Sequence, residues 1–433
     1  MKVTTAVPSA APWFYRALFT LIVPLALARL WWRGRKQRGY WANISERFGF
    51  IDVPKGNPII WLHAVSVGET RAAEPLVHAL LAQYPEYRIL LTHMTPTGRA
   101  TSKMLFRDPR ILIAYVPYDL TGAVDRFLSR VQPTLGLLME TEIWPNLILR
   151  SRHRQIPILL INARLSARSK KRYARFSHLI RPVLSALTAV GAQTQEDADR
   201  LRELGAQNIT VTGNLKFDVC VDHSLRALGK SWRQTLAEQR AVWLAASTRE
   251  GEEAIILEAH RLLCSKFKNP KETPMLVLVP RHPQRFDAIA EQIQRAGFRM
   301  GRRRAGSSSD QLDVWLGDSM GEMAAYYSMV DVAVIGGSLL PFGGQNLIEA
   351  AACGTPTVIG PYTYNFEAAA NTAVELGAAE RLDQVDATTL ADSIFQLISQ
   401  PERITAATQA TTRFVKEAAG ATNRTLQLIA QMG

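Results

Sequence analysis

The chain has 433 residues, of which 47% are hydrophobic and 21% are charged, and its formal net charge is +13. A chain of this length and apolar fraction folds into about two or three domains, and the composition excludes extensive disorder. The positive charge indicates an acidic partner: nucleic acid, an anionic membrane or a phosphorylated substrate. Three widely separated cysteines, Cys220, Cys264 and Cys353, exclude a disulfide scaffold and are typical of a protein in a reducing cytoplasm.

The N-terminal segment, residues 1–38, has the composition of a membrane anchor. Residues 13–32 are mostly apolar, with tryptophan at both ends. Four basic residues follow them: Arg33, Arg35, Lys36 and Arg38. Terminal aromatic residues and a basic flank are typical of membrane helices, and the flank predicts that the rest of the chain is cytoplasmic. Because Arg16, Pro24 and Arg29 disfavour a clean span, the helix either crosses the membrane or lies in its interface.

From residue 59 onward, apolar segments alternate with helical segments, which is typical of βαβ units and parallel sheets. The predicted strands of the first series are Ile59–Leu62, Ile89–Thr92, Ile111–Val116, Leu135–Met139, Ile158–Ile161, Ala189–Ala192 and Ile209–Thr212. Those of the second series are Val242–Ala245, Met275–Val279, Phe298–Met300, Asp313–Leu316, Val332–Ile335 and Thr357–Ile359. Residues 391–432 form a helical end, with a break at Pro401.

These two series predict an α/β fold of two doubly wound Rossmann-like domains facing a cleft. We expect the first domain at residues 39–218, a crossing segment at 219–240, and the second domain with the C-terminal helices at 241–433. This architecture usually brings a nucleotide-linked donor to an acceptor. A Rossmann dehydrogenase would need Gly-x-Gly-x-x-Gly after the first strand, and the single Gly68 there disfavours that class.

The segment Trp61–Thr70 (Trp-Leu-His-Ala-Val-Ser-Val-Gly-Glu-Thr) is the first candidate for chemistry. Its pattern predicts a strand, a tight turn and a helix, which places Ser66, Gly68 and Glu69 at a strand's carboxyl end, where parallel sheets bind ligands. Glu69 is the only acid in the segment. The alternative interpretation is that Glu69 is a first-turn acid that complements the helix dipole.

Acidic and basic residues are unevenly distributed in the first domain. Glu140 and Glu142 directly follow the predicted strand Leu135–Met139, whereas residues 143–195 contain ten Arg and Lys and no acid. Such a run is either a solvated basic face or a binding surface for an anion. Without stacking aromatics or a known motif, nucleic acid is disfavoured, and beside a membrane anchor a phosphorylated lipid fits better.

Three loops of the second series predict a nucleotide pocket. Glycine pairs at Gly336–Ser338 and Gly343–Gly344 follow one strand and let backbone amides approach an anion. Glu349, in the helix after them, is placed to accept hydrogen bonds from ribose hydroxyls. Arg281 follows a second strand and can pair with phosphate, while Gly317–Glu322 follows a third.

Many separate motifs, in one order along nearly the whole chain, carry a resemblance to a known family. They are His63–Glu69, Thr95–Gly98, Pro117–Leu120, Met139–Glu142, Trp144–Asn146, Asn162–Ser166, Thr212–Asp218, Glu250–Glu253, Val279–Pro283, Gly317–Asp318 and Met320–Glu322. On these motifs the chain resembles the bacterial 3-deoxy-D-manno-octulosonic acid (Kdo) transferases of lipopolysaccharide biosynthesis. That family is associated with the cytoplasmic side of the cell inner membrane.

The resemblance implies a GT-B fold and an inverting transfer of Kdo from CMP-Kdo to the lipid A precursor, without a metal ion or other cofactor. It implies that Glu69 is the general base and that Glu140 and Lys216 stabilise the transition state. The positions that match the CMP-binding segments are Pro280, Arg281, Met320, Gly321, Glu322, Asn346, Leu347, Ile348 and Glu349. As a base, Glu69 should be ionised at neutral pH and still buried enough to accept a proton from an alcohol.

The second half departs from the family pattern at four positions. Arg249, Gln345 and Tyr362 stand where many relatives have histidine, and Leu347 stands where they have proline. Gln345 can still donate a hydrogen bond, although it cannot carry the charge of an imidazolium.

Two alternatives to this function stay open: a GT-B transferase for a different sugar nucleotide, and a nonenzymatic anionic-lipid binder. The single Asp-x-Asp motif, Asp197–Asp199, stands at an apparent helix start in the first domain. We interpret it as a cap and surface charge rather than as a metal site. The expected partners are therefore CMP-Kdo, the lipid A precursor and the anionic surface of the inner membrane, and no nucleic acid.

Overall fold

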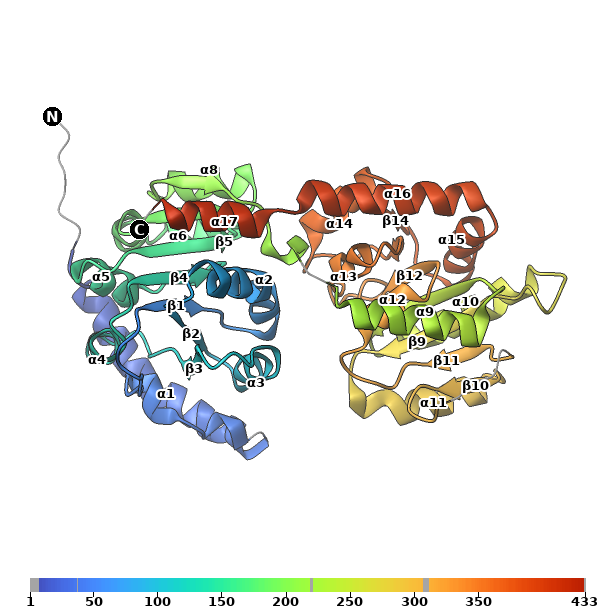
Figure 1. Ribbon diagram of the computed structural model, residues 1–433, viewed down its shortest axis with the longest axis horizontal. Helices are drawn as coiled ribbons and strands as arrows, with labels where there is room; N and C mark the ends of the chain where they lie inside the picture. Colours follow the sequence, from blue (N-terminus) through green and yellow to red (C-terminus); the bar gives the residue numbers. More distant parts are fainter. Residues whose placement is uncertain (1–7, 37, 219–220, 307–310, 432–433) are drawn as a thin grey trace. The chain divides into compact units, whose positions relative to one another are not determined.

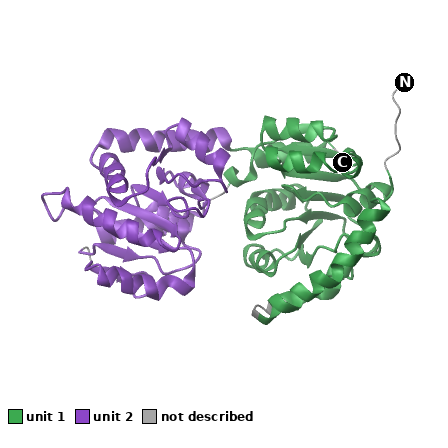
Figure 2. Cartoon of the chain, turned by 180° about the vertical axis from the view of Figure 1, so that it is seen from behind, with its two compact units in different colours: residues 1–218, 419–433 green, residues 219–418 purple. Residues whose placement is uncertain are grey.

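The computed structural model describes residues 8–36, 38–218, 221–306 and 311–431. The chain forms two compact units, shown in different colours in Figure 2. Unit 1 consists of Met1–Asp218 together with Ala419–Gly433, and unit 2 consists of Val219–Ala418. Cys220 lies outside the described residues.

Unit 1 is built on a parallel seven-stranded sheet in the order β3-β2-β1-β4-β5-β6-β7 (Figure 1). Its strands are β1 (Ile59–His63), β2 (Arg88–His93), β3 (Ile111–Tyr115), β4 (Leu135–Met139), β5 (Ile158–Ala163), β6 (Ala189–Ala192) and β7 (Ile209–Val211). Side chains alternate between the two faces, so Trp61 packs with Phe127 in one core cluster whereas Leu62 packs with Leu76 in another. The central strands β1, β4 and β5 are buried on both faces, so each is a nearly continuous apolar run.

The helices of unit 1 connect and cover these strands. They are α1 (Trp13–Lys36), α2 (Val67–Gln83), α3 (Pro96–Leu105), α4 (Thr121–Val131), α5 (Pro145–His153), α6 (Ala167–Ala174), α7 (Ser177–Ser185), α8 (Gln195–Glu203) and α17 (Ala421–Ala430). Three short 3₁₀ helices are η1 (Arg38–Tyr40), η2 (Ile44–Phe48) and η3 (Leu215–Asp218).

Unit 2 repeats this plan with a parallel seven-stranded sheet in the order β10-β11-β9-β8-β12-β13-β14. Its strands are β8 (Val242–Thr248), β9 (Met275–Pro280), β10 (Met300–Arg302), β11 (Val314–Leu316), β12 (Val332–Ile335), β13 (Thr357–Ile359) and β14 (Ala379–Arg381). Its helices are α9 (His223–Ala237), α10 (Glu252–Ser265), η4 (Pro283–Arg285), α11 (Phe286–Arg295), α12 (Met323–Ser328), α13 (Leu347–Ala352), α14 (Glu367–Glu375), α15 (Ala387–Ile398) and α16 (Pro401–Ala418).

Each sheet contains one point at which the strand order reverses. In unit 1, β1 pairs with β2 on one side and with β4 on the other, and in unit 2, β8 pairs with β9 and with β12. Connections on the two sides of this point diverge, which leaves a crevice at the carboxyl ends of the strands. The loops that the sequence singled out, after β1, β4, β8, β9, β11 and β12, lie at the carboxyl ends of strands near these points.

The structure confirms the α/β fold and the predicted strands, although β8 ends at Thr248 rather than Ala245 and β10 spans Met300–Arg302 rather than Phe298–Met300. The sequence missed β14, because this three-residue edge strand, Ala379–Arg381, has no apolar run. The predicted crossing at residues 219–240 contains helix α9, which belongs to unit 2 and packs against α12.

The placement of the C-terminal helix corrects the predicted domain boundaries. Residues 419–433 belong to unit 1 and not to the second domain. The Asp218 carboxylate accepts hydrogen bonds from the backbone N–H of Gly420 (2.6 Å) and of Thr422, which holds the start of α17 at η3. Leu428 and Ile429 of α17 then join the core of the first sheet. Pro401 begins α16 rather than only breaking a helix, and the chain returns to unit 1 after α16.

Candidate active site

Glu69 lies in the first turn of α2, directly after β1. Ser66 caps this helix, and the Glu69 carboxylate accepts hydrogen bonds from the Val65 backbone N–H (2.7 Å) and from the Ser66 hydroxyl (3.0 Å). The Glu69 N–H in turn donates to the Ser66 hydroxyl (3.5 Å), so the contacts resemble a capping box in which the Val65 N–H takes the place of the N-cap N–H. The interpretation of Glu69 as a helix-start acid is therefore correct for its contacts, and it does not exclude chemistry at the same carboxylate.

The environment of Glu69 gives it the acidity of a general base. Burial raises its pKa from 4.5 to about 7, and the negative charges of Glu140 and Glu142 add to this effect. The hydrogen bonds from Val65 and Ser66 act in the opposite direction. At neutral pH the carboxylate is therefore about half ionised. The sequence predicted a more fully ionised group because it did not show how deeply the side chain is buried.

Glu140 and Lys216 form an ion pair beside this turn. Glu140 follows β4 with a positive φ of 54°, an uncommon conformation for a residue with a side chain. Its Oε1 atom lies 2.9 Å from Nζ of Lys216, which comes from η3, and about one fifth of each side chain is exposed. The structure thus brings together, within unit 1, the three residues predicted to be catalytic.

His63 and Glu142 form a second polar pair at this edge of the sheet, to which the sequence gave no role. His63 is buried, and its Nδ1 atom donates to the Thr92 carbonyl oxygen (3.0 Å). Burial lowers the pKa of His63 to about 3, so the imidazole is neutral. Its Nε2 atom lies 3.8 Å from Oε2 of Glu142, which accepts a hydrogen bond from the Trp144 indole (2.7 Å). Burial raises the pKa of Glu142 as well.

Several motifs of the resemblance support the backbone of unit 1. The buried Asp119 carboxylate accepts from the N–H groups of Asn146 (2.9 Å) and Leu147 (2.8 Å) at the start of α5. Asn162, with a φ of 51°, accepts from the N–H of Leu215 (3.0 Å) and so positions the segment that carries Lys216. These side chains hold the backbone of the candidate site in place.

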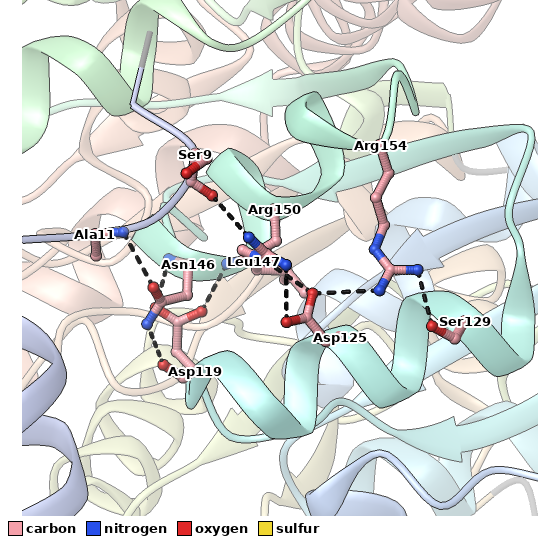
Figure 3. A network of polar contacts seen from close by, with 9 residues as sticks. All are labelled: Ser9, Ala11, Asp119, Asp125, Ser129, Asn146, Leu147, Arg150 and Arg154. Carbon is pink, nitrogen blue, oxygen red and sulfur yellow. Dashed lines mark hydrogen bonds and ion pairs between the residues drawn. The ribbon is translucent and has the colours of Figure 1, made fainter.

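The basic run at residues 143–195 is partly neutralised by acids from elsewhere in unit 1, which the sequence run did not show. Arg150 and Arg154 both pair with Asp125 of α4, and Lys170 pairs with Glu203 of α8 (Figure 3 shows the Asp125 pairs). The anion-binding hypothesis therefore rests on fewer cations than predicted. Arg164, Arg168, Lys171, Arg172 and Arg175 are exposed.

In unit 2, Glu252 holds the loops after β8 and β12 together. Its buried carboxylate accepts from the backbone N–H groups of Arg249 (2.7 Å), Gly337 (2.7 Å) and Leu339 (3.1 Å). Gly336 is required here, because an added Cβ would lie 2.5 Å from the Ser247 carbonyl oxygen. The sequence showed Glu252 only as part of a motif, and its organising role depends on the adjacency of β8 and β12.

Cationic side chains gather on the same loops. Nε of Arg281, after β9, donates to Oε1 of Gln345 in the β12 loop (3.2 Å). Arg249 lies 3.2 Å from the His282 ring and over the ring of Phe342. The side-chain oxygen of Gln345 accepts the hydrogen bond from Arg281, and its amide NH₂ group can donate to a ligand. Arg281 is exposed at the strand end, as predicted.

The other residues predicted to bind CMP differ in which groups they can present to a ligand. Pro280, Leu347 and Ile348 are buried, so their side chains belong to the core, and the Ile348 N–H is bonded to Asn346 (3.0 Å). The amide of Asn346 lies 3.3 Å from Glu349.

The loop after β11 contains an acidic side chain that is already hydrogen-bonded and a turn that is exposed to solvent. The Glu322 carboxylate accepts from Arg303 (2.9 Å) and from Ser319. Met320 is 57% exposed, and Gly321 has a φ of 83°, a conformation that favours glycine.

No group of three or more His, Cys, Asp or Glu side chains suited to a metal ion occurs among the described residues. The Asp-x-Asp motif begins α8 as predicted. The Thr194 hydroxyl caps this helix at the N–H of Asp197, whose carboxylate accepts from the Leu165 N–H (2.8 Å), and Asp199 pairs with Arg202 on the surface.

Comparisons with known proteins identify the family. Residues 42–219 match the family model described as 3-deoxy-D-manno-octulosonic-acid transferase (kdotransferase). The chain is 44% identical to the 3-deoxy-D-manno-octulosonic acid transferase of Bordetella pertussis over 96% of this chain and 98% of that one. It is 38% identical to the enzyme of the same name from Haemophilus influenzae, over 82% and 83% of the two chains.

A solved structure shares the fold. The glycosyltransferase from Rickettsia africae superposes with a TM-score of 0.56 at 14% identity, over 87% of this chain and 98% of that chain. With two doubly wound parallel sheets, this is the GT-B fold. The chain belongs to the 3-deoxy-D-manno-octulosonic acid transferase family of glycosyltransferases.

Proposed function

We propose that the protein transfers Kdo from CMP-Kdo to a sugar hydroxyl of the lipid A precursor, with inversion at the anomeric carbon. Family membership supports the sugar and the reaction. The single observation that carries the chemistry is Glu69, a carboxylate at the strand-order reversal of unit 1 with a pKa near 7. A base with this pKa is well matched to proton transfer near neutral pH.

In this proposal Glu69 accepts the proton of the acceptor hydroxyl as its oxygen attacks the anomeric carbon of Kdo. The new C–O bond forms while the bond to the CMP phosphate oxygen breaks, and CMP leaves with the bonding electrons. Lys216 stabilises the negative charge that develops on the departing phosphate, and Glu140 holds Lys216 in position. We propose that no metal ion takes part.

The loops of unit 2 bind the donor in this proposal. Arg281 pairs with the phosphate, Gln345 donates from its amide, and Glu349 accepts hydrogen bonds from the ribose. Arg281, which is exposed after β9, and the half-buried Arg249 after β8 support an anionic donor. Met320–Glu322 and Asn346–Ile348 contribute through their backbone and through the shape of the pocket.

We further propose that the enzyme works on the cytoplasmic side of the inner membrane, where the acceptor is a lipid. Helix α1 is long and apolar enough to associate with a membrane, which supports this location. The anionic membrane surface also suits the net charge of +13.

The test is a transfer assay with the purified full chain, CMP-Kdo and lipid A precursor, read out by product mass in excess chelator. We expect products heavier by whole Kdo residues, and we expect CMP to compete with the donor where UDP does not. Transfer from a UDP-sugar would contradict the donor assignment. Abolition by chelator would contradict the metal-free mechanism.

A further inference from the structure

Helix α1 has two faces with different environments. It is 24 residues long, and its partly buried positions follow one stripe that faces unit 1. These positions are Tyr15, Phe19, Val23, Ala26, Leu27 and Leu30, and they are followed by the buried Gly34. The spacing places these positions on one side of α1, and unit 1 contacts that side near the start of the helix, where Phe19 packs against Trp144, and at its end, where η1 packs against it.

The opposite side of α1 carries large apolar side chains that nothing in unit 1 covers. This outward stripe consists of Phe14 (49% exposed), Leu18 (56%), Leu21 (73%), Leu25 (70%) and Trp32 (63%). The same spacing of three, four or seven residues places them on one face. A contiguous exposed apolar stripe of this kind is typical of a surface that binds a membrane or another protein.

Both ends of α1 are fixed to unit 1. At the beginning, the Tyr15 hydroxyl donates to Asp119 (2.8 Å) and the Ala11 N–H donates to Asn146 (3.1 Å). Figure 3 shows this N-terminal segment beside Asp119 and Asn146. At the end, the Trp41 indole donates to the Trp31 carbonyl oxygen (3.2 Å), and the carbonyl oxygen of Gly39, directly after the helix, accepts from the Tyr115 hydroxyl of β3 (3.4 Å). The helix is therefore held along the surface of the folded unit and does not project from it.

We propose that α1 lies flat in one leaflet of an anionic phospholipid membrane, with the outward stripe inserted at the boundary between headgroups and acyl chains. Both ends of α1 are fixed to unit 1, and the helix is about 36 Å long. If α1 spanned the membrane, the polar surface of unit 1 beside it would have to enter the hydrocarbon core. Arg16, Arg29, Arg33 and Arg35 are exposed along the helix and can meet lipid phosphates. This inference rests on the membrane attachment in the proposed function and specifies its geometry.

The first test is the location of the N-terminus. Ser9 and Lys55 are both exposed, so each is replaced by cysteine. S9C and K55C are introduced separately into a C220S/C264S/C353S background. Spheroplasts of a bacterium that expresses each variant are then treated with a membrane-impermeant maleimide. We expect both sites to be protected in intact spheroplasts and labelled after lysis. Labelling of S9C alone in intact spheroplasts would show that α1 crosses the membrane.

The second test measures binding of the purified chain to phosphatidylcholine–phosphatidylglycerol vesicles by co-sedimentation. The double variant L21Q/L25Q should bind at least tenfold more weakly than the parent. The matched control is M104Q, which changes a side chain of unit 1 that is also exposed (58%) but lies on α3, and its binding should not change. Unchanged binding by L21Q/L25Q would overturn the proposed orientation.

Transfer to a detergent-dispersed acceptor separates this inference from the proposed function. L21Q/L25Q should transfer Kdo to such an acceptor at the parental rate, because the stripe lies outside the catalytic residues. Absence of transfer in the parent protein would contradict the proposed function and leave the vesicle result to decide the orientation of α1.

Discussion

The two units place opposite charges at the reversal points of two similar sheets. In unit 1, three carboxylates, those of Glu69, Glu140 and Glu142, lie near one another and interact, with Lys216 paired to one of them. In unit 2, the acids at the corresponding loops are bound by partners: Glu252 by backbone amides and Glu322 by Arg303. The same topology thus supports a negative site in one unit and a positive surface in the other.

This difference assigns different chemistry to the two units. Burial, with a smaller effect from the charges of Glu140 and Glu142, raises the pKa of Glu69 in unit 1, which suits proton transfer. In unit 2, burial and the positive charges of Arg249, Arg281 and Arg285 lower the pKa of His282, and this cluster of positive charges suits binding of an anion. In the proposed mechanism, the units therefore divide the reaction into proton removal and donor binding, and each prediction below tests one side of that division.

The largest effect is expected for Glu69→Gln. Loss of a general base lowers kcat by about 10² to 10⁴ fold, while CMP binding, assigned to unit 2, should stay at the parental Kd. Radioactive transfer assays and calorimetry with CMP measure the two quantities. Glu203→Gln, on a surface acid of the same unit, is the control and should retain activity. Parental turnover by Glu69→Gln would contradict the assignment of the base.

The next effect is expected for Lys216→Met, which removes the cation and leaves Glu140 without its ion pair. We expect kcat to fall about 10² to 10³ fold, because the charge on the departing phosphate loses its stabilising group. Lys170→Met breaks a surface pair with Glu203 and provides the matched control. An increase in the donor KM with an unchanged kcat would instead make Lys216 a residue for donor binding.

The fold was predictable because the central strands of both sheets are buried on both faces. Continuous apolar runs such as Ile59–Leu62 reveal their strands without knowledge of any partner. The position of α17 was not predictable in this way, because it depends on Asp218, about 200 residues earlier, which binds the start of the helix. Edge strand β14 was missed for the opposite reason, since an edge strand does not need an apolar run.

The site was predictable only where a residue's position along its own strand decides its role. Glu69 and Glu140 follow strands, so the βαβ pattern already places them at one edge. The contact between His63 and Glu142 also requires β4 to pair with β1, a strand order that the sequence does not contain. The pairing of Arg150 with Asp125 was missed for the same reason, and the basic run therefore seemed more highly charged than it is.

A smaller effect is expected for Arg281→Ala in unit 2. The KM for CMP-Kdo should rise about tenfold with little change in kcat, because the loss of one charge-assisted contact to phosphate costs about 1.5 kcal/mol. Arg295→Ala is the control, since Arg295 is exposed on α11 of the same unit and pairs only at the surface with Glu291. If Arg281→Ala lowered kcat alone, unit 2 would share in the chemistry and the division between the units would fail.

The most gradual effect is the pH dependence of transfer. Glu69 acts as a base only when deprotonated, and its pKa is raised to about 7, so kcat/KM should reach a plateau above pH 7 and fall about tenfold for each pH unit below it. Glu142→Gln removes one of the charges that raise this pKa and should move the fall in kcat/KM to lower pH, while leaving the plateau in place. A fall in kcat/KM centred near pH 4.5 in the parent protein would mean that the base is exposed to solvent. The contrast between a buried acidic site in unit 1 and an exposed cationic surface in unit 2 would then not explain the chemistry.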